Sequence, residues 1–203
     1  LVRSQPTREC RREAGKLIIG ILALQGGFQL HQLSLDSLQV KSDFIRYPKQ
    51  LDHCDALIIP GGESTTLMKQ IIENDFFDPL IDFANKKSIM GTCAGMIISS
   101  YSNPDNVNKS LSVIDIDVDR NSWGRQVHSF EAEIIVNFDI DNPFNATFIR
   151  APKVSRMGQG IKSFAKYGDS TVLLSDERHL MASFHPEIGD DNRIHKLFMG
   201  MIM

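Results

Sequence analysis

Apolar runs alternate with amphipathic segments through the first half of the chain, and this alternation predicts consecutive β–α units. Lys16–Leu24 and Ala56–Pro60 are almost continuously apolar, as expected for strands buried on both faces of a parallel sheet. Asp43–Tyr47 and Ser88–Met90 are predicted as two further strands. Helices are predicted over four segments: Gln29–Leu38 with apolar Leu30, Leu33, Leu35 and Leu38, Ser64–Glu73 with Ser64 as N-cap, Asp78–Lys86, and Met96–Tyr101.

The second half of the chain has a different pattern. Three short segments of alternating polarity predict antiparallel strands: Val113–Val118, Ser129–Val136 and Thr147–Ile149. Leu180–Phe184 is again apolar, and Asn192–Ile202 predicts a closing amphipathic helix. The predicted fold is therefore α/β: a three-layer, flavodoxin-like sandwich with a mostly parallel central sheet and a small antiparallel strand region.

Length and charge restrict the class of protein. The 203 residues suit a single domain, which is predicted to span residues 16–203. Residues 1–16 carry a net charge of +3 but lack the apolar core of a signal peptide, so residues 1–15 are predicted to be a disordered leader or a non-native remnant. The remaining net charge of −6 argues against nucleic acid as a partner. No apolar run approaches the ~18 residues of a membrane span.

The cysteines indicate a reducing compartment. Cys10, Cys54 and Cys93 are odd in number, and their spacing is typical of neither a disulfide framework nor a metal site. We therefore expect a cytoplasmic protein. The chain contains no H-E-x-x-H, paired C-x-x-C or glycine-rich phosphate motif, so neither a metal nor another cofactor is predicted.

A turn of small residues around Cys93 follows one predicted strand and precedes a predicted helix. Residues 91–95 read Gly-Thr-Cys-Ala-Gly. A sharp strand–turn–helix of this kind presents the nucleophile in many hydrolases. The helix N-terminus would also favour the thiolate form of the cysteine. Taken alone, Cys93 could equally be a buried structural cysteine in a tight turn.

His185-Pro186-Glu187 follows the predicted strand Leu180–Phe184 and could complete a catalytic triad. A thiolate nucleophile needs a base to move its proton and a third group to orient that base, and His185 and Glu187 can supply the two functions. Taken alone, the tripeptide would be a surface turn, but the cysteine turn favours the catalytic interpretation. Cys93 and His185 are 92 residues apart with the acid last, which fits neither an α/β-hydrolase nor a papain-like enzyme.

Other turns offer groups that could bind a substrate. The backbone N–H groups of Ala94 and of Gly61 or Gly62 are candidates for an oxyanion hole. Arg120 and Arg150 could each bind a substrate carboxylate in a bidentate pair, or could be solvated loop residues. The remaining histidines are predicted to be structural or exposed: His31, His53, His128, His179 and His195.

Together these motifs closely resemble those of the triad (class I) glutamine amidotransferases, and in particular of the glutaminase subunits of pyridoxal 5′-phosphate synthase. The resemblance covers about residues 17–203 and rests on the following segments: Leu22–Gly26, Pro60–Thr66, Gly91–Gly95, Arg120–Gln126, Ser129–Glu131, Phe148–Pro152 and Ser183–Glu187. Many triad amidotransferases share the cysteine turn and His-Pro-Glu. The Leu-Gln-Gly, Gly-Gly-Glu-Ser-Thr, Arg-Asn and Phe-Ile-Arg-Ala-Pro segments are more particular to this family.

The resemblance implies hydrolysis of L-glutamine to L-glutamate and ammonia. Cys93 would form a γ-glutamyl thioester, His185 would act as base and acid, and Glu187 would orient His185. The implied glutamine-binding residues are Gly62, Glu63, Ser64, Arg120, Ile149 and Arg150, with Gln25 beside the oxyanion hole. Ammonia would pass to a separate (β/α)8 synthase subunit that makes pyridoxal 5′-phosphate, and the glutaminase would be nearly silent until that partner docks.

Two other functions remain compatible with the sequence. The chain could be a triad glutaminase that serves a different synthase. It could also be a non-catalytic regulatory subunit, although the intact Cys93, His185 and Glu187 argue against this.

Overall fold

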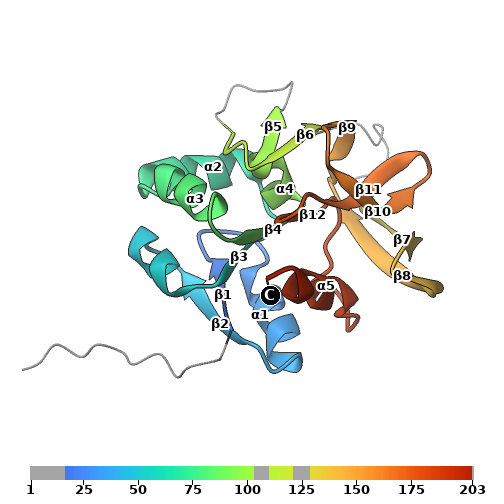
Figure 1. The fold of residues 1–203 in the computed structure, drawn as a ribbon, viewed down its shortest axis with the longest axis horizontal. Coiled ribbons are helices and arrows are strands. Elements are labelled where there is room, and N and C mark those ends of the chain that lie inside the picture. Colours follow the sequence, from blue (N-terminus) through green and yellow to red (C-terminus); the bar gives the residue numbers. More distant parts are fainter. Residues whose placement is uncertain (1–16, 103–109, 121–128, 203) are drawn as a thin grey trace, which may run out of the picture.

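Nine strands of the described residues form one sheet (Figure 1). Its neighbouring strands follow in this order: β2 (Lys41–Ile45), β1 (Ile18–Leu22), β3 (Ala56–Ile59), β4 (Ser88–Thr92), β12 (Leu180–Ala182), β11 (Ser170–Ser175), β10 (Lys162–Tyr167), β7 (Ser129–Val136) and β8 (Asp139–Ile149). The computed structural model describes residues 17–102, 110–120 and 129–202. The predicted leader, residues 1–15, lies outside the described residues, and the single domain stays a prediction.

The strands from β2 to β12 are parallel to their neighbours. Their order is that of a flavodoxin-like sheet, in which the strand order reverses between β1 and β3. β3, β4 and β12 are buried along their whole length, which is why apolar runs predicted them.

The strands from β12 to β8 are antiparallel to their neighbours. The prediction of a mostly parallel sheet is therefore wrong: the sheet is mixed, and the three-layer sandwich stays a prediction. Short hairpins explain the difference, because they join consecutive strands in antiparallel orientation. Tyr167 of β10 pairs with Ser170 of β11 across one turn, and Val136 of β7 pairs with Asp139 of β8 across another.

A smaller sheet contains β5 (Ser100–Ser102), β6 (Ile114–Asp119) and β9 (Lys153–Met157). β6 pairs with β5 in parallel and with β9 in antiparallel orientation. The predicted antiparallel strands therefore divide between two sheets. β6 belongs to the small sheet, whereas β7 and β8 extend the large one.

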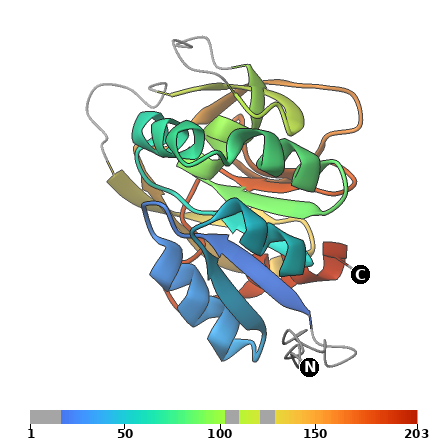
Figure 2. The ribbon, with the colours of Figure 1, turned by 90° about the vertical axis from the view of Figure 1, so that its left-hand side faces the viewer.

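Helices pack against both faces of the parallel strands. They are α1 (Phe28–Ser37), α2 (Ser64–Glu73), α3 (Phe77–Ala84), α4 (Ala94–Ser99) and α5 (Arg193–Ile202), with a 3-10 helix at Pro48–His53. One apolar cluster includes side chains of α2, α3 and α4, and a second includes side chains of α1 and α5. Figure 1 accordingly shows α2 and α3 on one side of β3 and β4, and α1 and α5 on the other, and Figure 2 shows α1 apart from α2 and α3 in the turned view. None of the helices in the described part of the chain is long and apolar enough to cross a membrane.

The buried face of α1 differs from the predicted one. Leu30 and Leu33 are 41% and 63% exposed, whereas His31, Ser34 and Leu35 are buried. This face of α1 packs against the polar side chains of Thr92 and Glu187 as well as against apolar side chains. The leucine pattern alone therefore predicted the helix but not its orientation.

Candidate active site

Four turns lie together at the carboxyl ends of the parallel strands. Residues 25–27 follow β1, residues 60–63 follow β3, Cys93 follows β4, and residues 183–187 follow β12. Because the strands are parallel, these ends meet at one edge of the sheet, where open α/β sheets bind their ligands. The structure thus brings together the turns that the sequence singled out.

Cys93 lies at the sharp turn between β4 and α4. Its φ of 48° and ψ of −104° are rarely adopted by residues other than glycine. Its backbone N–H donates to the carbonyl oxygen of Ala182 at 2.9 Å, which ties the turn to β12. The Cys93 side chain is buried, and its Sγ lies 3.5 Å from the backbone oxygen of Ile149. This strained strand–turn–helix has the geometry of a nucleophile elbow.

His185 and Glu187 form a buried pair beside Cys93. His185 Nδ1 lies 2.7 Å from Glu187 Oε1, and the ring lies next to Cys93, since a Cβ at Gly61 would come within 2.3 Å of His185 Cε1 and 3.2 Å of Cys93 Cβ. A carboxylate next to Nδ1 requires a proton on that nitrogen, which leaves Nε2 for the sulfur. The backbone N–H of His185 donates to the Thr147 carbonyl at 2.9 Å, so β8 fixes the position of the histidine.

The pKa values of this pair favour its charged form. Burial lowers the pKa of His185, but the hydrogen bonds and charges of Cys93 and Glu187 outweigh burial and raise the pKa to about 10. Burial raises the pKa of Glu187. The electrostatic effect of the nearby His31 and the hydrogen bond and charge of His185 outweigh burial and hold this pKa below the ordinary value for Glu. At neutral pH, His185 is therefore protonated and Glu187 is ionised.

The glycines after β3 permit a close approach to the nucleophile. A Cβ at Gly61 would lie 2.3 Å from His185 Cε1 and 3.2 Å from Cys93 Cβ, so any larger residue would displace the His185 ring or the Cys93 side chain. A Cβ at Gly62 would lie 2.7 Å from Gln25 Nε2. The predicted oxyanion-hole residues Gly61, Gly62 and Gln25 thus form one set of contacts beside Cys93, and Ala94 follows Cys93 directly.

Glu63 caps α2, so the predicted N-cap, Ser64, is wrong. The Glu63 carboxylate accepts hydrogen bonds from the backbone N–H groups of Thr65 at 3.0 Å and Thr66 at 2.6 Å. Ser64 is instead the first helical residue, because the extended backbone lies at Glu63. Burial raises the pKa of Glu63, but these hydrogen bonds outweigh it and lower the pKa to about 2.

Arg120 follows β6 and reaches the same helix end. Its Nη2 donates to Thr65 Oγ1 at 2.9 Å and also to Ser64 Oγ, and lies 3.5 Å from Glu63 Oε1. Three of the predicted substrate-binding residues, Glu63, Ser64 and Arg120, are therefore in contact. The rest of the predicted Arg-Asn segment, residues 121–126, lies outside the described residues.

β8 ends at Ile149, next to Cys93, and Arg150 follows the strand. The backbone oxygen of Ile149 lies 3.5 Å from the Cys93 sulfur. Arg150 has a φ of 45° and an exposed side chain. The structure thus brings Ile149 to Cys93 and leaves the Arg150 guanidinium open to solvent at the adjacent position.

Comparison with known proteins establishes the family. The family model described as SNO glutamine amidotransferase family matches residues 21–203. This chain belongs to that family. The family predicted from the motifs is confirmed.

Proteins similar to this chain are named pyridoxal 5′-phosphate synthase subunit PdxT. The protein from Desulforamulus reducens is 42% identical over 187 residues, covering 92% of this chain and 100% of its own. The protein from Francisella philomiragia is 43% identical over 183 residues, covering 90% and 98%. The protein from Thermosipho africanus is 44% identical over 185 residues, covering 91% and 98%.

Solved glutamine amidotransferases have the same fold as this family member. One crystal structure of a glutamine amidotransferase matches with a TM-score of 0.85 and 36% identity, over 91% of this chain and 98% of that chain. A glutamine amidotransferase from Thermotoga maritima matches with a TM-score of 0.58 and 11% identity, over 91% and 81%, and shows the fold alone. An α/β fold with a large mixed sheet is therefore common to them.

Two buried histidines of this chain, His31 and His195, lie behind the site, although the sequence predicts them to be structural or exposed. His31 Nε2 lies 3.4 Å from Glu187 Oε2, and His31 Nδ1 lies 3.0 Å from His195 Nε2. The signal that could have revealed His31 is its spacing of three and four residues from Ser34 and Leu35, which places all three on one helix face. Within the described residues, no group of three or more His, Cys, Asp or Glu side chains could hold a metal ion.

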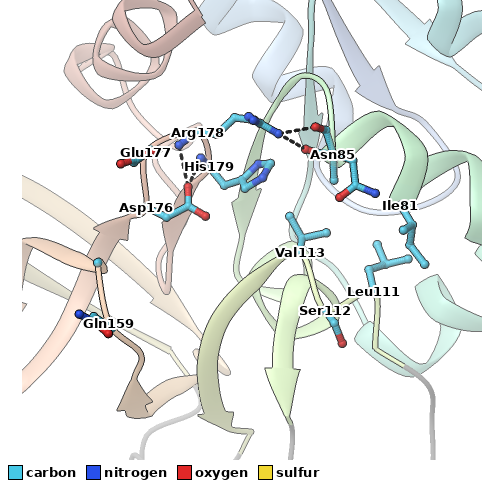
Figure 3. A pocket seen from close by; sticks show the side chains of 12 residues that line it. Ile81, Asn85, Leu111, Ser112, Val113, Gln159, Asp176, Glu177, Arg178 and His179 are labelled. Atoms are coloured by element: carbon cyan, nitrogen blue, oxygen red, sulfur yellow. Dashed lines mark hydrogen bonds between the residues drawn. The ribbon is translucent and has the colours of Figure 1, made fainter.

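A cavity of about 430 Å³ lies away from this site. Figure 3 shows Arg178 pointing toward Asn85, and Arg178 Nη1 donates to the Asn85 carbonyl at 2.6 Å. The backbone N–H groups of Arg178 and His179 donate to Asp176 Oδ1 at 2.7 and 2.6 Å. Asn85 precedes β4 and residues 176–179 precede β12, so the cavity borders the amino ends of these two strands. Cys93 and His185 follow the opposite, carboxyl ends of β4 and β12. Its polar groups hold loops together, and no predicted site residue lines it.

Proposed function

We propose that this chain hydrolyses L-glutamine to L-glutamate and ammonia through a cysteine thioester. The observation that carries the proposal is that Cys93 and His185 both border Gly61 and that His185 Nδ1 lies 2.7 Å from Glu187, at the carboxyl ends of the parallel strands. Membership of a glutamine amidotransferase family supports the same reaction.

The contacts suggest a role for each triad residue. The Cys93 thiolate attacks the side-chain amide carbon, protonated His185 gives its proton to the departing nitrogen, and the carbon–nitrogen bond breaks to release ammonia. The neutral His185 then takes a proton from water as the water oxygen attacks the thioester, which frees glutamate and restores the thiolate. Glu187 stabilises the imidazolium and fixes its orientation in both steps.

The oxyanion and the rest of the substrate would bind to the neighbouring turns. The backbone N–H groups of Ala94 and of Gly61 or Gly62 would stabilise the oxyanion, with Gln25 beside them. Glutamine would also contact the following residues: Gly62, Glu63, Ser64, Arg120, Ile149 and Arg150. An ionised Glu63 suits the substrate ammonium group, and an arginine suits its carboxylate.

Ammonia would be used by a partner rather than released. We assign as partner a pyridoxal 5′-phosphate synthase subunit of (β/α)8 fold, because the similar relatives are named as subunits of that synthase. We place the reaction in the cytoplasm, where thiols stay reduced, because the two cysteines of the described residues, Cys54 and Cys93, are free.

Glutamine-dependent ammonia release, measured with a pyridoxal 5′-phosphate synthase subunit present, tests the proposal. We expect release by the wild-type chain and none above background by Cys93→Ala, because the proposed thioester forms on the Cys93 sulfur. Undiminished release by Cys93→Ala would overturn the mechanism. Stimulation by a different synthase alone would show that the chain serves another partner, and a silent wild-type chain would favour a regulatory subunit.

A further inference from the structure

A buried line of polar contacts begins at Glu187 and is not used by the proposed mechanism. Glu187 Oε2 has no hydrogen-bond partner among the described residues, and the side chain facing it is His31, whose Nε2 lies 3.4 Å away. The same Nε2 lies 3.3 Å from Thr92 Oγ1, and the other ring nitrogen of His31 contacts His195 Nε2 at 3.0 Å. Both histidines are 0% exposed.

These contacts favour one arrangement of the protons. A carboxylate oxygen needs a donor opposite it, so His31 carries its proton on Nε2 and accepts at Nδ1. His195 then donates from Nε2 and keeps a lone pair on Nδ1, which has no partner in the described part of the chain. The reverse arrangement would bury an unpartnered N–H of His195 and aim a lone pair of His31 at Glu187, which is less favourable.

Both rings are suited to the neutral form that this arrangement requires. Burial lowers the pKa of His31, and it outweighs the opposing effect of Glu187. Burial and the neighbouring His31 lower the pKa of His195 to about 3. The groups that face His31 are thus His195 from α5, Thr92 from β4, and Glu187 with His185 from the turn after β12.

The start of α1 and the His31 side chain both lie against the Glu187 carboxylate. A Cβ at Gly27, the N-cap of α1, would lie 3.1 Å from Glu187 Oε1, so the start of α1 lies against this oxygen. His31 follows one turn later on α1 and faces the other oxygen. The positive end of the helix dipole favours the negative charge of Glu187 at this place.

We propose that His31 is a positioning residue for glutamine hydrolysis. Its neutral Nε2–H, shared with Thr92 Oγ1, faces Glu187 Oε2 at 3.4 Å and favours the carboxylate orientation in which Oε1 stays against His185 Nδ1. His195 fixes the tautomer of His31. The inference rests on the proposed function of the triad. Without a donor at Oε2 the carboxylate can rotate, so His185 loses its fixed orientation toward Cys93. Turnover then falls while substrate binding is retained, because Glu187 lies between His31 and His185.

Ammonia release by the chain in complex with its synthase subunit tests this inference. His31→Leu removes the donor, and we expect kcat to fall about tenfold while KM changes by less than about twofold. His31→Gln can donate from a side-chain amide near the position of Nε2, and we expect it to recover most of the loss. His179→Leu is the matched control, because His179 is also buried but contacts the backbone N–H of Ile89 rather than the triad. It should keep the wild-type kcat.

The possible outcomes separate the inference from its alternatives. A wild-type kcat in His31→Leu, or equal losses in His31→Leu and His31→Gln, would overturn the inference. If His31→Leu does not fold, nitrogen-15 NMR of the wild-type histidines decides: protons on Nε2 of His31 and His195 support the inference, and a proton on Nδ1 of His31 contradicts it. A wild-type chain no more active than Cys93→Ala would instead overturn the proposed function, whatever the His31 variants show.

Discussion

The imidazole of His185 is confined by Glu187 on one side and by Cys93 and Gly61 on the other. Its ring is bound at Nδ1 by the carboxylate, and its Cε1 leaves no space for a side chain at Gly61. The charge and the position of this one ring therefore depend on single atoms of its neighbours. A substitution at Glu187 should change the charge of the ring, and a substitution at Gly61 should change its position.

The charge of His185 should depend on Glu187. We expect Glu187→Gln to lower the pKa of His185, because a neutral amide removes the carboxylate that stabilises the imidazolium while burial remains. NMR titration of the His185 ring measures this: the wild-type ring should stay protonated until about pH 10 and the variant ring should lose its proton at lower pH. An unchanged titration midpoint would contradict the assignment of Glu187.

The position of His185 should depend on Gly61. We expect Gly61→Ala to lower kcat about a hundredfold, because displacement of a catalytic group by about 1 Å is enough for such a loss. Gly200→Ala is the matched control, since a Cβ at Gly200 meets no atom within 4 Å. Ammonia release measures both variants. Wild-type activity in Gly61→Ala would show that the ring has more freedom than these contacts allow.

Single residues of the site differ in how far the sequence could reveal them. Cys93, His185 and Glu187 each follow an apolar run, and a polar residue at a strand end is visible in the pattern of the chain. His31 and His195 instead lie inside helices, where a buried histidine is usually structural. Their relation to Glu187 depends on how α1 and α5 pack, which no local pattern contains.

At the scale of elements, α5 is tied to β8 by one side chain at its start. Arg193 Nη1 contacts Asp139 Oδ2 at 2.8 Å and donates to the Asn142 carbonyl at 2.6 Å, and Nη2 donates to the Pro143 carbonyl at 2.9 Å. We expect Arg193→Met to lower the free energy of unfolding by about 1–2 kcal/mol, because these acceptors lose their donor. Urea denaturation measures the loss, and exposed Lys49→Met should leave stability unchanged. Equal stability of the two variants would contradict this role of Arg193.

The start of α2 depends on an ionised Glu63. We expect Glu63→Ala to lower the free energy of unfolding by about 0.5–1 kcal/mol at neutral pH, as for the loss of other helix caps. Because the folded pKa of about 2 lies below the ordinary 4.5, this stabilisation is present above pH 4.5 and is lost as the pH falls toward 2. Urea denaturation across this range should show the two proteins converging. A difference that stayed constant down to pH 2 would contradict the cap.

Elements were predictable where local pattern and burial agree. The parallel strands β1, β3 and β4 are buried on both faces, so their apolar runs predicted them. β10 has the sequence Lys-Ser-Phe-Ala-Lys-Tyr, of which only Ala165 is buried, so it carries no strong signal. β11 is buried throughout, and its pairing with β10 through a hairpin made the sheet mixed rather than mostly parallel.

At the scale of the whole molecule, the site lies where the parallel and antiparallel parts of the sheet meet. β12 pairs with β4 in parallel orientation and with β11 in antiparallel orientation, and its following turn carries His185. β8 belongs to the antiparallel part, yet its Thr147 carbonyl binds the His185 backbone and its Ile149 carbonyl contacts Cys93. The antiparallel strands therefore help to build the site that the parallel strands begin.

The nucleophilic role of Cys93 is the central claim, and covalent labelling tests it most directly. The chain in complex with a pyridoxal 5′-phosphate synthase subunit would be treated with a glutamine-mimicking electrophile and examined by peptide mass spectrometry. Cys54 is an internal control, because burial raises its pKa to about 11 and keeps it a thiol. We predict an adduct on Cys93 that free glutamine suppresses, and none on Cys54. An unlabelled Cys93, or equal labelling of both cysteines, would contradict the account.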